Sequence, residues 1–387
     1  MVGDINTRPE IVGARLKAAR SVKRLTQESA ASALGVARTT IVAMESGKRP
    51  VAPSELRTLA ELYETSEGEL LDDELPELQM EVDFRMNSQD TQGIEEASVA
   101  AILHRLAAST IQLENLVGQR APKLDLPDVS ISRTGSLEQQ AEDAALALRT
   151  RLGIGLGPIQ DLTALMEFEL GMRVFERPLP SQVSGAVAFD ASAGAFVLLN
   201  SLHPLYRRRV TAGHEIGHVL VRKLGVSILF AEAEPTDREE RFFDLFGVAL
   251  LTPAAAVRKK AEELQRMFGT FSVRHLLMMG VFFNVSIEAM TRRMVQLGLL
   301  KPGTYEQLRT KGVGLKHRDQ VLDELPEMEK APPFTPRALL LASLAYQRDL
   351  LSEQQIASML ELDLVSVRRA LDSDAGDLKE SSLELAF

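Results

Sequence analysis

The sequence contains no cysteine, and only six of its 387 residues are histidine. Without cysteine the chain can form neither disulfides nor thiolate metal sites, a composition that fits a reducing compartment. Any metal site must therefore be built from histidine and carboxylate side chains. We accordingly expect a cytoplasmic protein.

Long hydrophobic runs are also missing. No apolar stretch approaches the roughly 18–20 residues needed to span a bilayer, and the first ten residues, MVGDINTRPE, contain no signal-peptide core. Hydrophobic residues make up 45% and charged residues 25% of the chain, the balance of a globular protein. We expect no membrane partner, and the length predicts two to four domains.

Positive charge is outnumbered overall, since the chain has 44 Lys or Arg residues against 54 Asp or Glu residues and a formal net charge of −10. Residues 1–50 depart from this average because they hold nine Lys or Arg residues and four Asp or Glu residues, a local charge of +5. A basic module on an acidic body is expected when one domain binds DNA. A solvated charged face gives the same pattern, so the charge alone leaves both interpretations open.

Short helical segments follow one another between residues 10 and 71. Thr26 is suited to cap the helix QESAASAL, and Gly35 is suited to end it. The next segment, ARTTIVAMES, ends at Gly47. Two short helices joined by a tight glycine-containing turn are typical of a helix-turn-helix. We interpret residues 8–72 as an all-α helix-turn-helix domain.

The segment LTQESAASALGVARTTIVAMESGKRP resembles the XRE family of repressors. The matching features are Thr26-Gln27, Gly35-Val36, Ile41 and Glu45-x-Gly47. The resemblance implies a module that binds a double-stranded DNA operator, and because such modules act as dimers on palindromes, we expect a homodimer. The helical region 93–118 suits dimerisation and packing within the chain equally well.

The second helix of the pair should begin near Ala37 and lie in the major groove. Its first residues, Arg38, Thr39 and Thr40, should point toward base edges. Only Arg38 has base-reading chemistry of its own, because helix capping also explains the two threonines. The resemblance implies a phosphate contact by Gln27, at the start of the preceding helix. Lys48 and Arg49, after the recognition helix, add positive charge. These predicted DNA contacts are, in that order, Arg38, Thr39, Thr40, Gln27, Lys48 and Arg49.

The rest of the chain predicts a fold that is mainly α with a small β-sheet. Residues 73–135 read as a helical spacer and linker. A helix should start at Ser136, and the runs MRVFERPL, SGAVAFD and GAFVLLN predict short strands of an α+β domain over residues 136–300. Residues 302–335 read as a loop-rich connector. The helical C-terminal region, 301–387, has a helix-turn-helix-like outline, but its acids favour a structural or protein-contact role.

The stretch TAGHEIGHVLVRK contains the motif HExxH. Residues four apart lie on one face of a helix, so His214 and His218 can bind a single metal ion. Glu215 points about 100° around the helix, beside a metal-bound water rather than at the metal. Zinc lowers the pKa of such a water to near 7, and Glu215 can accept its proton as general base. A buried helix with incidental histidines is the alternative.

A catalytic zinc ion needs a third protein ligand and leaves one position for water. No histidine lies between His218 and His275, so we expect a carboxylate from the helix in EPTDREERFFDLFGVALLTP. Glu240 and Asp244 are four apart on one face, as a ligand and a partner for a ligating histidine require. Glu239 is the fallback ligand. An exposed acidic stripe would look the same without the HExxH motif nearby.

The runs FVLLN, RRRVTAGHEIGH and EERFFDLFGVALLTP resemble the ImmA/IrrE family of zinc metallopeptidases over residues 136–300. The resemblance implies a zincin-like domain that binds Zn²⁺, with the family's ligand glutamate at Glu240 and its asparagine at Asp244. The chain departs from the family's alanines at Gly213, Phe243 and Gly247-Val248, which changes packing more than chemistry.

The sequence does not assign a residue to transition-state stabilisation. Tyr206 and His203 lie just upstream of the HExxH motif, and the family points clearly to neither.

Two functions of different classes fit this domain order. In the first, a DNA-binding transcriptional regulator carries a gluzincin-like endopeptidase that cleaves a regulatory protein, an XRE-type repressor or the chain itself, to switch gene expression as in a stress response. In the second, the chain is a sequence-specific regulator whose peptidase-like domain is a sensor or dimerisation module without significant proteolysis. The intact Glu215 favours the first.

Overall fold

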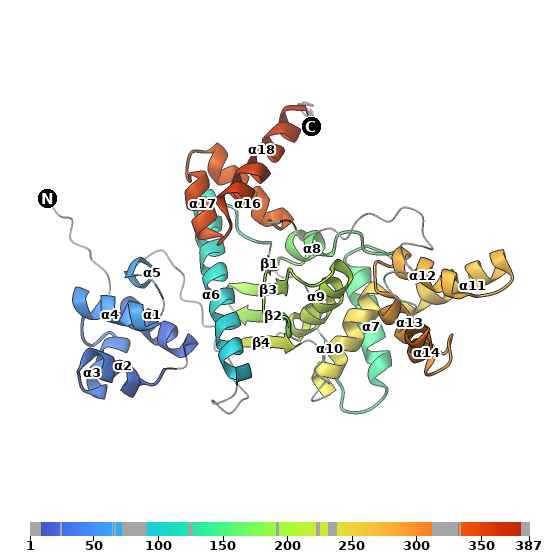
Figure 1. Ribbon diagram of the computed structural model, residues 1–387, viewed down its shortest axis with the longest axis horizontal. Helices are drawn as coiled ribbons and strands as arrows, with labels where there is room; N and C mark the ends of the chain where they lie inside the picture. The colour runs from blue at the N-terminus through green and yellow to red at the C-terminus, as the bar shows by residue number, and fades with distance from the viewer. Residues whose placement is uncertain are drawn as a thin grey trace. The chain divides into compact units, whose positions relative to one another are not determined.

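The computed structural model describes residues 9–23, 25–63, 65, 67–71, 91–122, 126–127, 129–190, 193–221, 225–230, 238–311, 332 and 334–380. The chain forms two compact units. One combines Met1–Arg120, Gly225–Ser227 and Ala338–Phe387, and the other combines Ala121–Leu224 and Ile228–Arg337. Helices predominate, with one small mixed sheet (Figure 1), so the predicted fold class is confirmed.

The first part of unit 1 is a cluster of short helices that share one apolar core. They are α1 (Pro9–Val22), α2 (Gln27–Leu34), α3 (Arg38–Glu45), α4 (Pro53–Tyr63) and α5 (Glu67–Leu71). The predicted ends of α2 are confirmed, because Thr26 accepts a hydrogen bond from the Ser29 N–H at 3.0 Å and Gly35 adopts φ 65°. A left-handed φ is one that glycine adopts without strain.

A buried ion pair sets how α1 crosses α3. Gly13 allows the crossing, since a Cβ there would collide with the Met44 carbonyl oxygen. Arg20 then reaches Glu45, with 2.5 Å between Nε and Oε1 and 3.0 Å between Nη2 and Oε2. Glu45 is only 8% exposed, and a buried carboxylate is stable only when it is paired and hydrogen-bonded. The pair therefore fixes α3 against α1.

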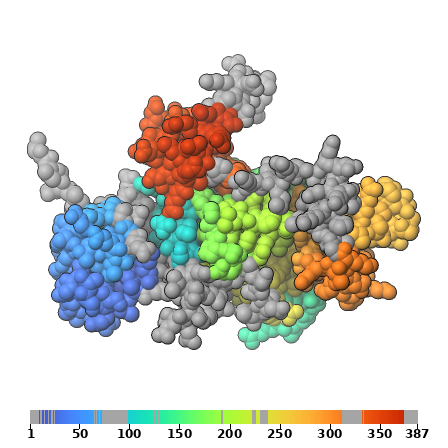
Figure 2. All heavy atoms as spheres, in the orientation of Figure 1, coloured from blue at the N-terminus to red at the C-terminus, as the bar shows by residue number. Residues whose placement is uncertain are grey.

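The second part of unit 1 joins α6 (Thr91–Val117) to the C-terminal helices α16 (Pro336–Gln347), α17 (Glu353–Met359) and α18 (Leu364–Glu380). Arg105 pairs with Glu361 at 2.7 Å, and Arg348 donates to the Val117 carbonyl oxygen at 2.8 Å. Figures 1 and 2 show the red C-terminal helices beside the teal α6. The predicted helical region 93–118 and the predicted helices of the C-terminal region are confirmed, and contacts between residues far apart in sequence hold them together.

A four-stranded sheet has the order β1-β3-β2-β4. Its strands are β1 (Arg173–Arg177), β2 (Val183–Asp190), β3 (Gly194–Asn200) and β4 (Gly225–Phe230). β1 runs parallel to β3, and β2 runs antiparallel to it, with Val187 opposite Val197. The three predicted strand segments are confirmed. β4 was not expected, because its six residues lie between regions whose patterns indicate helices.

Helices make up the rest of unit 2. They are α7 (Leu137–Arg151), α8 (Leu162–Ala164), the π-helical turn η1 (Leu165–Glu169), α9 (Leu205–Leu220), α10 (Arg238–Leu251), α11 (Ala254–Phe268), α12 (Val273–Phe282), α13 (Ile287–Gln296) and α14 (Thr304–Thr310). Ser136 caps α7 as predicted. The prediction of a loop-rich connector over 302–335 is wrong at α14, and residues 312–331 lie outside the described residues.

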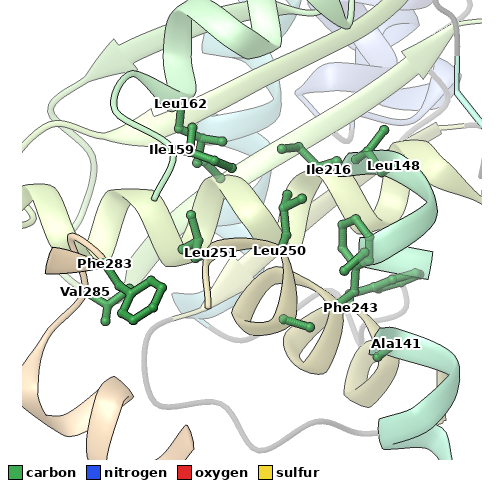
Figure 3. Close-up of a cluster of buried hydrophobic side chains, with 14 of the residues drawn as sticks. Ala141, Leu148, Ile159, Leu162, Ile216, Phe243, Leu250, Leu251, Phe283 and Val285 are labelled. Carbon is green, nitrogen blue, oxygen red and sulfur yellow. The ribbon is translucent and has the colours of Figure 1, made fainter. Parts of the chain in front are cut away.

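The core of unit 2 lies where α7, α9 and α10 meet. Figure 3 shows Leu148 of α7, Ile216 of α9, and Phe243 and Leu250 of α10 converging, with Val285 at the end of the same cluster. This apolar packing supplies the main stabilisation of the two helices that carry the candidate metal ligands.

Asn200, at the end of β3, anchors the connection from β1 to β2. Its side chain is completely buried. Nδ2 donates to the carbonyl oxygens of Pro180 at 3.1 Å and Val183 at 2.8 Å, and Oδ1 accepts from the Leu179 N–H at 3.2 Å. These bonds satisfy backbone groups that would otherwise be buried without partners.

Among the described residues, no single helix has the length and apolar character needed to cross a membrane. One pair, Val273–Phe282 with Ile287–Gln296, meets the length and composition test only jointly and bends by 103° between its helices.

Glu167, on η1, is a buried carboxylate that accepts hydrogen bonds from Thr335 and Arg337 of the same unit. It is 2% exposed. It accepts hydrogen bonds from Thr335 Oγ1 at 2.6 Å and from the Arg337 N–H at 2.7 Å. Burial raises its pKa to about 7, and these hydrogen bonds offset only part of that effect. The folded chain therefore favours a protonated Glu167.

We expect Glu167→Gln to stabilise the protein above pH 7 and to change little below pH 4.5. The folded pKa is about 7 and the ordinary value is 4.5, so the stabilisation from protonation is present below pH 4.5 and is lost as the pH rises through 7. The loss amounts to about 3 kcal/mol. Chemical denaturation across this range measures it, with the exposed Glu169→Gln as control. Equal pH dependence of wild type and Glu167→Gln would contradict the assignment.

Candidate metal centre and nucleic-acid interface

The backbones of α9 and α10 are in direct contact where Gly213 faces Gly247, with no side chain between them. A Cβ on Gly213 would lie 2.9 Å from the Cα of Gly247, and a Cβ on Gly247 would lie 2.7 Å from the backbone nitrogen of His214. Both distances are shorter than real Cβ contacts, so each helix needs glycine at the crossing. The close approach brings the histidines of α9 to the acids of α10.

Two buried arginines hold the C-terminal end of α10. Arg149 donates from Nη1 to the Leu250 carbonyl oxygen at 2.5 Å, and Arg293 donates from Nε to the Thr252 carbonyl oxygen at 3.1 Å. The last carbonyls of a helix have no partner within the helix. Burial lowers the pKa of both arginines to about 10, which leaves them charged at neutral pH. Charge-assisted hydrogen bonds thus fix the end of α10.

Three ligand atoms face one another across the α9–α10 crossing. The Nε2 atoms of His214 and His218 are 3.0 Å apart, and Glu240 Oε2 lies 3.5 Å from the first and 3.6 Å from the second. A tetrahedral zinc ion holds its N and O ligands about 3.4 Å apart, because its bonds are about 2.0–2.1 Å long. The triangle therefore fits such an ion and leaves a fourth position for water. Glu239, the fallback ligand, is not part of this cluster.

Asp244 orients one of the two histidines. Its Oδ1 lies 2.7 Å from His214 Nδ1. A carboxylate in this position accepts the Nδ1 proton and leaves the lone pair of Nε2 for a metal ion. Asp244 thus lies where the sequence placed a partner for a ligating histidine, one helical turn from Glu240.

The charges of the cluster depend on one another. Burial lowers the pKa of His214, but hydrogen bonds to Asp244 and Glu240 raise it further, to about 10. Burial raises the pKa of Glu240, and the two histidines hold it well below its usual range. A cation that binds at His214 Nε2 must replace a proton there, so metal binding is coupled to proton release.

Glu215 is a buried carboxylate beside this cluster. It is 1% exposed, and neither of its oxygens has a hydrogen-bond partner among the described residues. Burial raises its pKa to about 8. A buried carboxylate without a partner is costly, and a water molecule on a metal ion is the partner that HExxH chemistry provides. Gly185 of β2 makes room for it, since a Cβ there would lie 3.2 Å from Glu215 Oε1.

His203, one of the two upstream residues considered for transition-state stabilisation, lies outside the cluster. His203 Nε2 is 3.2 Å from the Ser181 carbonyl oxygen, and burial lowers its pKa. His203 does not belong to the group of ligand atoms.

α3 presents a polar and partly apolar outer face. Ile41 and Met44 are buried against the core, whereas Arg38, Thr39 and Val42 are exposed, with Val42 at 41%. The exposed position of Val42 was not predicted, because an apolar residue in a helix is expected to lie in the core. Its spacing of three residues from Thr39, on the face opposite the core, was the available signal. Thr40, also predicted, is half-buried.

Gln27 connects the buried ion pair to the outer face. Its Nε2 donates to Glu45 Oε2 at 2.9 Å, and its Oε1 accepts from Arg38 Nη2 at 3.2 Å. Arg38, predicted to read bases, is thereby held beside the start of α2. Lys48 is exposed, whereas Arg49 is half-buried and its Nη2 is 2.9 Å from Glu55 Oε1. Part of the Arg49 charge is therefore neutralised within the chain.

Comparisons with known proteins match two parts of the chain. Residues 168–295, which contain the His–His–Glu cluster, match a peptidase family model described as an IrrE N-terminal-like domain. Residues 11–73, which contain α2 and α3, match a helix-turn-helix domain. No curated protein matched. A crystal structure of ComR from Streptococcus suis is similar over 96% of both chains at 10% identity, but its TM-score of 0.16 supports no argument.

We expect the purified protein to bind about one zinc ion per chain and His214→Ala to abolish this binding, because it removes one of three ligands. Asp244→Ala should weaken zinc binding about 10- to 100-fold, since it removes the partner that orients His214. Elemental analysis and chelator competition measure both effects, with His203→Ala as a matched control. Full occupancy in His214→Ala would contradict the assignment of the site.

Proposed function

We propose that this chain, which carries a helix-turn-helix domain followed by an IrrE N-terminal-like domain as both sequence resemblances predicted, is a DNA-binding transcriptional regulator with endopeptidase activity. In this proposal a zinc-dependent centre cleaves a regulatory protein, either a repressor or the chain itself, and so switches gene expression. One observation carries the enzymatic part. Glu215 is a buried carboxylate with unpaired oxygens beside a His–His–Glu cluster.

The residues of the centre have distinct roles in this proposal. His214, His218 and Glu240 would hold the ion, which when bound polarises a substrate carbonyl and acidifies a water molecule. Glu215 accepts a proton and returns it to the leaving amine. Burial raises its pKa to about 8 when no cation is bound, and a cation held by the three ligands would lower that pKa, so that the carboxylate is ionised and able to accept a proton. Asp244 holds the proton on Nδ1 of His214.

The DNA-binding part rests on the outer face of α3. Arg38, Thr39 and Val42 are exposed there, and an arginine, a threonine methyl and a valine can recognise guanine and the thymine methyl in the major groove. In this proposal Gln27 and Lys48 contact the phosphate backbone. We propose that the chain binds a double-stranded operator as a homodimer, which matches the symmetry of palindromic sites.

We expect Glu215→Gln to retain zinc and to lose proteolysis, because the amide cannot accept the proton while the three ligands stay in place. The measurement compares wild type and Glu215→Gln for cleavage of co-expressed repressors and of the chain itself, with zinc content determined in parallel. Cleavage by Glu215→Gln at the wild-type rate would refute the role of Glu215. If zinc-loaded wild type cleaves none of these proteins, the chain acts as a regulator whose peptidase-like domain has no significant activity.

We expect substitutions on α3 and after it to separate base reading from backbone binding. Arg38→Ala or Val42→Ala should cost about 1–3 kcal/mol on the selected operator and relax preference at one base pair. Lys48→Ala should weaken binding to all sequences and reduce the salt dependence by about one charge. Fluorescence anisotropy on operators chosen by selection measures this, with the exposed Arg57→Ala of α4 as control. Equal losses on every sequence would contradict base reading by α3.

A further inference from the structure

We propose that Phe243 is a positioning residue that orients the imidazole of His218 toward the metal ion. The inference rests on the proposed zinc centre and adds a residue to it. Phe243 is fully buried. Its ring centroid lies 4.1 Å from that of His218, with 39° between the ring planes, and 5.8 Å from that of His214, edge-on at 78°. It is therefore the ring against which both candidate ligands pack.

The two histidines are held by different contacts. His214 has Asp244 at 2.7 Å from Nδ1, which fixes its ring through a charge-assisted hydrogen bond. His218 has the face of Phe243 against its ring. An imidazole can rotate about its Cα–Cβ and Cβ–Cγ bonds, and a close aromatic neighbour excludes the rotations that would turn Nε2 away from Glu240. Packing against Phe243 thus fixes the ring orientation of His218, as the hydrogen bond to Asp244 fixes the ring orientation of His214.

Gly217 is the counterpart of Phe243 on α9. A Cβ at Gly217 would lie 3.0 Å from Phe243 Cδ1 and 3.2 Å from its Cα. These contacts are tighter than nearly all real Cβ contacts, so a side chain at 217 would displace Phe243 from its position against the histidines. The glycine between the ligands and the phenylalanine on α10 form a complementary pair.

The chain offers a matched control for this role. Phe246 lies three residues further along the same helix and is equally buried in the same core. Its ring stacks on Phe242, at 6.2 Å and 19°. Phe243→Leu and Phe246→Leu therefore remove similar amounts of apolar contact from one helix, and only the first removes the ring that faces the ligands.

The experiment measures zinc affinity of the full chain by chelator competition, and the visible absorption of Co²⁺ in place of zinc. We expect Phe243→Leu to weaken zinc binding about tenfold or more and to change the shape of the Co²⁺ bands, since a rotated His218 alters the ligand geometry. Phe246→Leu should change zinc affinity less than about threefold and leave the bands unchanged. Thermal unfolding of the metal-free variants reports whether both lose similar stability.

Equal effects of the two leucine variants on zinc affinity and on the Co²⁺ bands would overturn the proposal, because Phe243 would then act only through core stability. If wild type binds no zinc, the proposed centre itself fails, and this outcome is distinct from the first.

A second comparison tests the pairing with Gly217. Gly217→Ala should weaken zinc binding in wild type, because the added methyl group displaces the phenyl ring. In the Phe243→Leu background, Gly217→Ala should lower zinc affinity by a smaller factor than it does in wild type. The nearest contact of the added methyl group is Cδ1 of the phenyl ring, and that ring is then absent. If the zinc affinity of the double variant fell by the product of the two single-variant factors, the two positions would not be coupled.

Discussion

The backbone contact between Gly213 and Gly247 is the constraint on which the site depends. The HExxH motif brings two imidazoles together on α9, but the third candidate ligand comes from α10, twenty-two residues after His218. Only a close crossing of these helices places Glu240 Oε2 within 3.6 Å of both histidines. A methyl group at either glycine would meet the opposite backbone. Gly213 and Gly247 therefore allow the crossing that brings the third candidate ligand to the other two.

Buried charge maintains this arrangement from several sides. Arg149 and Arg293 bind the carbonyl oxygens at the C-terminal end of α10, and Asp244, in the middle of α10, binds His214 of α9. Glu215, in contrast, is buried without a partner among the described residues. Buried polar groups are usually hydrogen-bonded, and an exception of this kind is expected at a functional site. The fold thus holds three candidate ligand atoms and an unpartnered carboxylate close together, as the proposed metal centre requires.

Much of this could be predicted from the sequence because it is local. The spacing of His214 and His218 on one helical turn, the cap at Thr26 and the exit at Gly35 each follow from a few neighbouring residues. Glu240 and Asp244 could be proposed because the same spacing rule applies to α10. These predictions need the helix type and register, and no knowledge of what each helix packs against.

What could not be predicted depends on contacts between segments far apart in the chain. The outward position of Val42, the ring of Phe243 against His218 and the network that joins Gln27 to Glu45 follow from how helices pack. The strand β4 and the short helix α14 lie in segments without a clear hydrophobic period, so their patterns indicate neither.

The proposed metal centre requires one zinc ion between α9 and α10. Anomalous X-ray diffraction at the zinc absorption edge, from crystals of the full chain grown with zinc, is the most direct test. We expect one strong peak within about 2.0–2.2 Å of the Nε2 atoms of His214 and His218 and of Oε2 of Glu240. A peak at other residues with none between these three side chains would contradict it.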